Sequence, residues 1–411
     1  MTTSLVRRLG RFDAVVITAV LWFLGKFVRF AFPPLFERLG TVYDVSAAML
    51  GGAFSALLFV YAALQFPSGL LADRFSPVAV IGGGSLLAAV GALALAVDGP
   101  LPVLIGAMLI IGAGTGPLKT VSLQVLSRTY PGQTGRVLGV FDTFGAFGGA
   151  AAPAAVVLFA GSPAVFGAGW RTTFLLAGLV GVGVTVALVV RVPERLPDED
   201  TDENADQGSV DAEAAAPVRE YGALFREWRF SVFVLVTSLF SFAYNATIAF
   251  LPLYFTREAG FGSTTASLLF SALFAVSLVQ LLTGEISDRT GTLPVIVLTV
   301  GLATVGLGSV LLLTGVGGPL ALGGAVVCLG IGAHGYRPVR GAYLMSVIPT
   351  SVAGGSLGAV RTIQMVAGAS SPALVGVLSE TVGLRPAFGL LTAALLAATG
   401  LSILLWLADT A

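Results

Sequence analysis

Gly69-Leu70-Leu71-Ala72-Asp73-Arg74-Phe75 forms a charged loop that follows a long apolar run. A near copy, Gly284-Glu285-Ile286-Ser287-Asp288-Arg289-Thr290-Gly291, lies 215 positions further along the chain. Only 11% of the residues are charged, so a chance repetition of a charged loop is a poor explanation. The repeat predicts that the two halves of the chain are copies of one unit.

The composition indicates a membrane protein. Hydrophobic residues make up 56% of the chain, which excludes a soluble globule with a wetted surface. Apolar runs of about 20 residues, enough to cross the hydrocarbon core of a bilayer, recur along the whole sequence. The predicted spans lie near 14–36, 46–68, 78–97, 101–126, 137–160 and 172–190, and near 230–255, 264–284, 293–315, 319–347, 353–378 and 386–407.

The basic residues predict the orientation. Arg7, Arg8 and Arg11 precede a full-length span without a small-residue cleavage pattern, which indicates an uncleaved first helix. If the N-terminus is inside, the inner segments hold twelve arginines and the outer loops four. Since cytoplasmic loops collect Lys and Arg, both termini are expected in the cytoplasm, with the protein a multi-pass component of the plasma membrane.

An acidic segment separates the two halves. Residues 193–217 carry a dense run of Asp and Glu and almost nothing apolar, which predicts a flexible cytoplasmic linker. The expected division is therefore 1–192, an N-terminal six-helix bundle; 193–228, the linker; and 229–411, a C-terminal six-helix bundle. A solvated tether and a regulatory or partner-binding segment are both open readings of the linker.

Together, the six-plus-six spans, the acidic central segment and the repeated Asp-Arg loop resemble the major facilitator superfamily. The resemblance implies an all-α membrane protein whose 12 transmembrane helices form two pseudo-symmetric bundles that rock about a central site. It also implies a gating role for the loop residues, with Asp73 and Asp288 pairing with a neighbouring Arg or helix end. Simple topogenic charge is the alternative. The gating candidates are Gly69, Asp73, Arg74, Gly284, Asp288 and Arg289, the two glycines permitting close helix approach.

Charged residues within the spans are the strongest functional signal. Six basic residues remain inside spans against one clear acid, Asp142. Each charge costs at least about 2.5 kcal/mol to insert, so such cations persist where they face water, a partner or a substrate. The six are Lys26, Arg29, Lys119, Arg337, Arg340 and Arg361.

The repeat aligns some of these charges. Lys119 matches Arg337 at an offset of 218, and Asp142 matches Arg361 at an offset of 219. Asp142 is either a permanent partner of Lys119 or the acid that carries a coupling proton. The sequence is compatible with both roles of Asp142.

Several residues are candidates for one central site. Lys26 and Arg29 are expected to face the cavity, with an internal ion pair as the alternative. Arg340 is a candidate gate that could instead reach the interface, and His334 is a ligand, a proton-coupling group or a hydrogen-bonded bundle residue. The predicted substrate-binding residues are Lys26, Arg29, Lys119, Tyr244, Asn245, His334, Arg337 and Arg361.

Three functions compete. The first is a symporter or antiporter for a small organic anion, a carboxylate or phosphate ester, with proton coupling as an option. The second is efflux of drugs or metabolites by an antiporter of the same family, although Met108 stands where drug exporters commonly carry an arginine. The third, an enzyme, lacks paired metal ligands, a phosphate loop or a cysteine nucleophile. We expect no enzyme activity, cofactor, metal site or nucleic-acid partner, and a monomer in the lipid bilayer.

Overall fold

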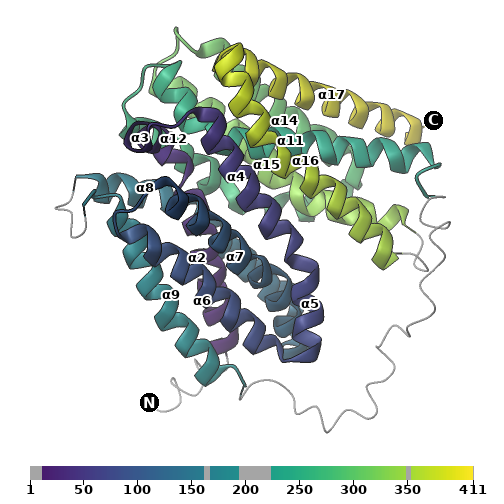
Figure 1. Cartoon of the computed structure of the whole chain (residues 1–411). Helices are drawn as coiled ribbons and strands as arrows, with labels where there is room; N and C mark the ends of the chain where they lie inside the picture. The colour runs from purple at the N-terminus through teal and green to yellow at the C-terminus, as the bar shows by residue number, and fades with distance from the viewer. Residues whose placement is uncertain (1–11, 162–166, 194–223, 349–352, 411) are drawn as a thin grey trace, which may run out of the picture. The chain divides into compact units, whose positions relative to one another are not determined.

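A computed structural model of the chain describes residues 12–161, 167–193, 224–348 and 353–410 (Figure 1). Within these ranges every regular element is a helix, and twelve helical runs are long and apolar enough to cross a membrane. The predicted all-α, twelve-span architecture is therefore confirmed. Most of the acidic linker, residues 194–223, lies outside the described residues.

The helices follow the predicted spans closely. Those of the first half are α2 (Asp13–Phe30), η2 (Pro33–Leu35), α3 (Phe36–Tyr43), α4 (Ala47–Ala63), α5 (Gln65–Arg74), α6 (Pro77–Ala96), α7 (Leu101–Thr129), η3 (Pro131–Gln133), α8 (Thr134–Ala160) and α9 (Arg171–Arg191). Those of the second half are α11 (Trp228–Arg257), α12 (Ser263–Ala275), η6 (Val276–Leu278), α13 (Val279–Thr290), α14 (Thr292–Leu313), α15 (Pro319–Val347), α16 (Ala353–Thr381) and α17 (Leu384–Thr410).

The chain divides into two compact units. The N-terminal unit is Met1–Val45 with Ala53–Glu199, and the C-terminal unit is Ser46–Gly52 with Asp200–Ala411. The sequence assigns 46–52 to the first half, so the structure differs there. Within the C-terminal unit, the Ala48 N–H donates to the Glu380 carboxylate at 2.7 Å.

The two charged repeats are helix ends and not loops, which corrects the sequence interpretation. The first continues α5 to Arg74 and the second continues α13 to Thr290, because neither contains a residue that stops a helix before its last position. The chain turns only afterwards. In the first half Ser76 caps α6 by accepting the Ala79 N–H at 3.1 Å, and in the second Gly291 turns with φ of 90°.

The second span of each half is also broken near its middle. Leu64 separates α4 from α5, and the short η6 separates α12 from α13. The position 215 residues after Leu64 is Val279, the first residue of α13, so the break is repeated in both copies. In the first half Pro67 accounts for the break, because its ring conflicts with the carbonyl of Ala63 four residues earlier, where α4 ends. The second copy has no proline at the equivalent Leu282, and the sequence analysis did not predict either break.

The repeat extends to helix packing. Helices α7 and α15 are each 29 residues long and begin 218 positions apart. A Cβ at Gly114 of α7 would lie 2.4 Å from the Ala88 backbone nitrogen of α6. At the equivalent Gly332 of α15, it would lie 2.3 Å from the Ala303 nitrogen of α14. Both copies thus bring two helix backbones into contact through a glycine at the same position.

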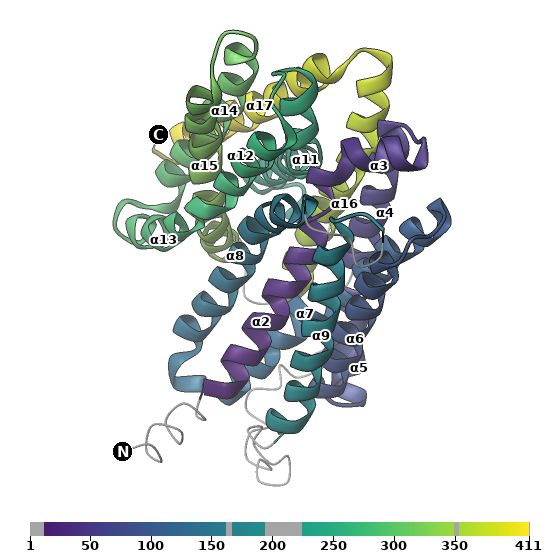
Figure 2. The ribbon, with the colours of Figure 1, turned by 90° about the vertical axis from the view of Figure 1, so that its left-hand side faces the viewer.

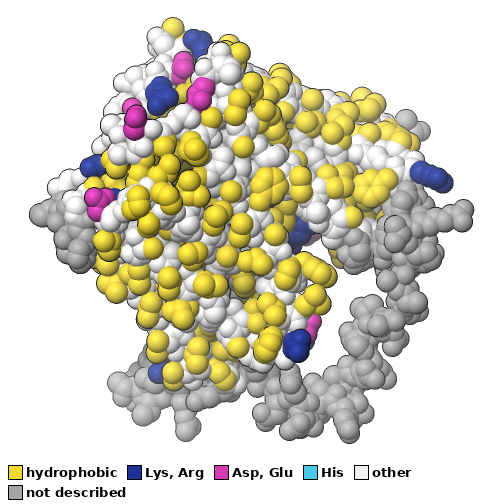
Figure 3. All heavy atoms as spheres, in the orientation of Figure 1, with side chains coloured by type: hydrophobic (Ala, Val, Ile, Leu, Met, Phe, Trp, Pro, Cys, Tyr) yellow, Lys and Arg dark blue, Asp and Glu magenta, His cyan; other side chains and the backbone are white. Residues whose placement is uncertain are grey.

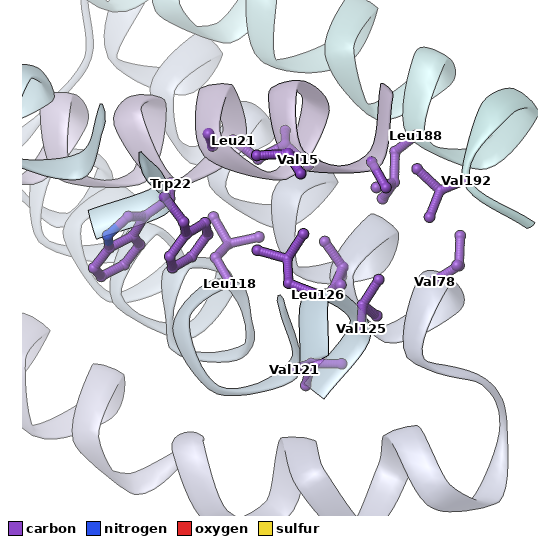
Figure 4. Close-up of a cluster of buried hydrophobic side chains, with 14 of the residues drawn as sticks. Val15, Leu21, Trp22, Val78, Leu118, Val121, Val125, Leu126, Leu188 and Val192 are labelled. Atoms are coloured by element: carbon purple, nitrogen blue, oxygen red, sulfur yellow. The ribbon is translucent and has the colours of Figure 1, made fainter. Parts of the chain in front are cut away.

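A continuous apolar core fills the N-terminal unit. Helix α2 packs against α7, α8 and α9, and Figure 2 shows α2 running beside α8 and α9. Figure 4 shows Trp22 next to Leu118, while Val78, Leu188 and Val192 gather toward the other end of the cluster. The ring of Trp22 is 3% exposed and therefore belongs to this core.

The outer surface is apolar. On the face shown in Figure 3, hydrophobic side chains cover most of the helices and charged side chains are few. Large apolar residues are exposed in both units, among them Leu158, Val186, Leu312 and Leu320. A water-facing surface would not tolerate so many of them, so these faces suit contact with lipid.

A buried arginine, Arg171, connects the start of α9 to the end of α6. Arg171 at the start of α9 is 4% exposed, donates to the Leu95 and Val97 carbonyls at the end of α6, and forms an ion pair with Asp98 at 2.5 Å. Arg385, near the start of α17, is exposed and donates to the Leu311 carbonyl at 3.3 Å. The two arginines occupy similar places but differ in burial.

We expect Arg171→Ala to lower the free energy of unfolding by about 2 kcal/mol, because two carbonyls lose their donor. The matched variant Arg385→Ala removes one exposed contact and should have little effect. The apparent melting temperature of the detergent-solubilised protein measures both. Equal shifts in the two variants would contradict the structural role of Arg171.

Candidate functional site

Three side chains of α2 meet on one face of the helix. Trp22, Lys26 and Arg29 are spaced at i, i+4 and i+7, which places them one above another. The Lys26 ammonium lies 5.3 Å from the centroid of the Trp22 ring, and the Arg29 guanidinium carbon lies 5.4 Å from it. Both cations are therefore within the range of a cation–π contact with one indole.

Arg29 is the more deeply buried of the two cations. It is 4% exposed, and its Nε donates to the Gly25 carbonyl at 3.2 Å. Its guanidinium carbon lies 4.0 Å from the centroid of the Tyr61 ring on α4. Arg29 thus lies between two aromatic rings, those of Trp22 and Tyr61, which fixes the plane of the guanidinium.

The third cation reaches the same ring from another helix. Lys119 of α7 lies 5.5 Å from the Trp22 ring centroid and 5.2 Å from that of Phe141. Its ammonium forms an ion pair with Asp142 of α8. The predicted Lys119–Asp142 pair is therefore present. The side chains are 17% and 46% exposed, so the acid is the more accessible partner.

These residues form one group, which we term the tryptophan cluster: Trp22, Lys26, Arg29, Lys119 and Asp142. The sequence predicted its four charged members but missed Trp22, whose helical spacing from Lys26 and Arg29 could have revealed it. Nothing in the sequence singles out Tyr61.

A second group lies in the C-terminal unit. Arg337 of α15 donates to the Tyr244 hydroxyl of α11 at 3.3 Å. The His334 ring packs edge-on, 6.5 Å from Tyr244 and 5.9 Å from Phe274, and is fully buried. Three predicted site residues, Tyr244, His334 and Arg337, are therefore brought together, although the burial of His334 limits its access to solvent.

The remaining candidates of this unit have other contacts. The Asn245 amide donates to the Ser241 carbonyl of its own helix at 2.9 Å. The Arg340 guanidinium carbon lies 5.9 Å from the Tyr336 ring. Arg361 is exposed on α16. Asn245 and Arg361 therefore stay predicted ligands, and Arg340 stays a predicted gate.

The charged helix ends make different contacts from those expected. Asp73 accepts a hydrogen bond from the Gln124 amide of α7 at 3.1 Å, and no described ion pair joins it to Arg74. Arg289 pairs with Glu285, one turn earlier in its own helix, at 2.5 Å. In the described part of the chain, Asp73 and Asp288 therefore form no ion pair with an arginine. No feature of the sequence singled out Gln124.

The two repeat glycines do not mediate close helix approach, which corrects the expectation. A Cβ built on Gly69 or on Gly284 would meet no described atom within 4 Å. Both lie on helix surfaces that no described neighbour approaches. Their role in gating, with that of Arg74 and Asp288, stays a prediction.

Comparisons with known proteins agree on the family. The family model described as Major Facilitator Superfamily matches residues 15–372. A protein of Cupriavidus necator named "Probable sulfoacetate transporter SauU" is 27% identical over 378 residues, covering 87% of this chain and 83% of that protein.

Solved structures share the fold. A bacterial homologue of the human lysosomal transporter Spinster, in an inward-facing and unoccupied conformation, matches with a TM-score of 0.74 at 14% identity, covering 96% of this chain and 97% of that chain. The xylose transporter XylE from E. coli, in an inward-open conformation, matches with a TM-score of 0.75 at 14% identity, covering 96% and 95%. At these identities the likeness supports the fold alone.

Proposed function

Since the chain belongs to the Major Facilitator Superfamily, whose model matches residues 15–372, we propose that this transporter moves a small organic anion by alternating access. The substrate is a carboxylate or a related oxyanion, such as a phosphate ester or a sulfonate. The protein lies in the cell membrane with both termini in the cytoplasm, works as a monomer and catalyses no chemical reaction.

The observation that carries the proposal is the gathering of three cations on one ring. Lys26, Arg29 and Lys119 come from two helices and all lie within 5.5 Å of the Trp22 centroid. Cations within a membrane span are costly unless they face water, a partner or a substrate, so three of them around one ring favour an anionic ligand. Asp142 offsets the charge of Lys119.

The relative from Cupriavidus necator supports the same class of substrate. Its printed name identifies sulfoacetate, which is a small organic anion. Arginine binds carboxylate, phosphate and sulfonate oxygens in a bidentate manner, and lysine supplies a compact charge. In the proposal the C-terminal unit contributes Arg337 and Tyr244, with Asn245, His334 and Arg361 as further ligands.

Coupling to protons is the second part of the proposal. Asp142 and His334 are the proposed coupling residues, since they are the carboxylate and the imidazole among the proposed site residues. The hydrogen-bond geometry favours Asp142 as the partner of Lys119, which leaves His334 as the candidate proton carrier. The charged ends of α5 and α13, and Arg340, are proposed gates.

Uptake into proteoliposomes tests the function. The panel is acetate, malonate, sulfoacetate and glycerol phosphate, each supplied as a radiolabelled anion. We expect Lys26→Ala and Arg29→Ala each to reduce uptake of the transported anion roughly tenfold, since a charge-assisted contact is lost. Arg385→Ala, which removes an exposed arginine outside the site, is the control. Unchanged uptake in both site variants would contradict the assignment of Lys26 and Arg29 to an anion site.

A further inference from the structure

A side chain of α13 donates a hydrogen bond to the backbone of α15 near the middle of that helix. The Thr283 hydroxyl lies 2.9 Å from the Gly335 carbonyl oxygen and 3.3 Å from the Gln280 carbonyl oxygen of its own helix. A hydroxyl has one hydrogen to donate, so the shorter contact identifies Gly335 as the acceptor. Thr283 is 7% exposed, and the bond between the two spans is therefore shielded from water.

Helix α15 is interrupted by a proline at the same place. Pro338 lies inside the helix, has no N–H to donate, and its ring conflicts with the preceding turn, which contains Gly335. Glycine also allows the neighbouring helices to come close, since a Cβ at Gly335 would lie 2.9 Å from Thr283 Cγ2 and 3.1 Å from Thr299 Cγ2 of α14. The turn in which α15 loses a hydrogen bond of its own is thus supported by α13 and α14.

The supported turn carries an arginine of the proposed anion site. A Cβ at Gly335 would point at Thr283, and the side chain of Arg337, two residues further on, leaves the helix about 200° away. On that side Arg337 donates to the Tyr244 hydroxyl at 3.3 Å, and its guanidinium carbon lies 5.5 Å from the centroid of the Tyr244 ring. A change in the bend of α15 would therefore move Arg337 relative to Tyr244.

The first copy of the repeat has a different arrangement. The equivalent of Thr283 is Ser68, 215 positions earlier, whose hydroxyl donates within its own helix at 2.8 Å. The equivalent of Gly335 is Pro117, 218 positions earlier. The hydrogen bond from Thr283 is therefore a feature of the second copy and not of the scaffold that the two halves share.

We propose that Thr283 is a positioning residue that fixes the bend of α15 at Pro338 and so holds Arg337 in place for the anion. It also joins the site to the charged end of α13, because Asp288 and Arg289 lie on the same helix five and six residues further on. This inference rests on the proposed anion transport and adds a residue to the C-terminal part of its site. Thr283 acts through Arg337 and does not itself contact the transported anion.

Uptake kinetics of the transported anion test this role. Thr283→Val removes the hydroxyl with little change of shape, and we expect it to raise KM roughly fivefold. Thr283→Ser keeps the hydroxyl and should stay within about twofold of the wild-type protein. In an Arg337→Ala background Thr283→Val should raise KM no further, because the arginine that it positions is gone. Ser68→Ala, the equivalent change in the first copy, should leave KM unchanged.

Spin labels test the contact between the helices without transport. Cysteines introduced at Thr290 and Met345, exposed residues near the ends of α13 and α15, carry the two labels in a Cys328→Ser background. Electron paramagnetic resonance then measures the distance between the labels. We expect Thr283→Val to broaden the distribution of this distance, since the bond that joins the two helices is lost.

A pair of glycine variants supplies an independent test that leaves Thr283 in place. Gly335→Ala adds a methyl group 2.9 Å from Thr283 Cγ2, which should part the helices and change KM and the label distance as Thr283→Val does. Gly341→Ala lies on the same helix, and its methyl group meets no described atom within 4 Å, so both quantities should stay unchanged. Size-exclusion profiles establish that each variant is folded, and if Thr283→Val is not, Gly335→Ala carries the test.

The outcomes separate this inference from the proposed function. If the wild-type protein takes up none of the anions tested, the proposed function fails, and the label distances still decide whether Thr283 holds α13 and α15 together. An unchanged distance distribution in Thr283→Val overturns the inference even if anions are transported. An equal rise in KM with and without Arg337 would show that Thr283 serves the fold in general, and would also overturn it.

Discussion

Asp142→Asn is expected to destabilise the protein by about 2 kcal/mol, because Lys119 then lies against Trp22 and Phe141 without its anion. This magnitude is below that of a fully buried pair, since the Asp142 side chain is 46% exposed. Lys119→Met should cost a similar amount. The double variant should recover most of the loss, because neither charge is left unpaired.

Transport should show the same pattern as stability. We expect each single variant to lose roughly 30-fold in uptake, equivalent to about 2 kcal/mol, since the cluster loses its arrangement of charges. The measurements are apparent melting temperature and proteoliposome uptake across the complete double-mutant cycle. Additive losses, with no recovery in the double variant, would show that the two residues act independently.

The same variants separate the two roles of Asp142. If it serves as the partner of Lys119, the residual uptake of Asp142→Asn should still respond to an imposed pH gradient as the wild-type protein does. Counterflow exchange, which needs no driving gradient, is the control for a functional site. A variant that retains exchange but no longer responds to the gradient would identify Asp142 as the proton carrier.

The repeat made much of the fold predictable from the sequence. Nearly constant offsets of 215 to 219 residues identified two copies, and apolar runs of span length predicted the twelve helices. The same offsets pointed to Lys119 and Asp142, which the structure pairs. Tyr244, His334 and Arg337 were each predicted as site residues, and the structure shows that they contact one another. Helical spacing and the offset between the two copies can both be read from the sequence, so these features could be predicted.

The missed features depend on contacts between helices. Aromatic residues are common in apolar spans, so Tyr61 carried no signal until the structure placed Arg29 beside it, and only its helical spacing from Lys26 and Arg29 pointed to Trp22. The glycines of the repeated motif were expected to face a neighbouring helix, but Gly69 and Gly284 face open space. A glycine in a sequence does not reveal which way its missing Cβ would point, and the orientation of the helix decides that.

Two pairs of glycines at equivalent positions of α7 and α15 differ in what an added Cβ would meet. Gly114 and Gly332 face a helix backbone, whereas Gly106 and Gly324, each eight residues earlier in α7 and α15, face no described atom within 4 Å. We expect Gly114→Ala and Gly332→Ala each to destabilise the protein by roughly 3 kcal/mol, because backbone atoms 2.4 and 2.3 Å from the new methyl group must move apart.

Gly106→Ala and Gly324→Ala are the matched controls, since they change the same residue type in the same two helices. They should leave stability unchanged or raise it slightly, because alanine has the higher helix propensity. Apparent melting temperature and the yield of monodisperse protein measure all four variants. A large loss in one copy with none in the other would mean that the contacts between α7 and α6 and between α15 and α14 are not energetically equivalent, and that the duplication preserves the helix pattern without preserving its packing.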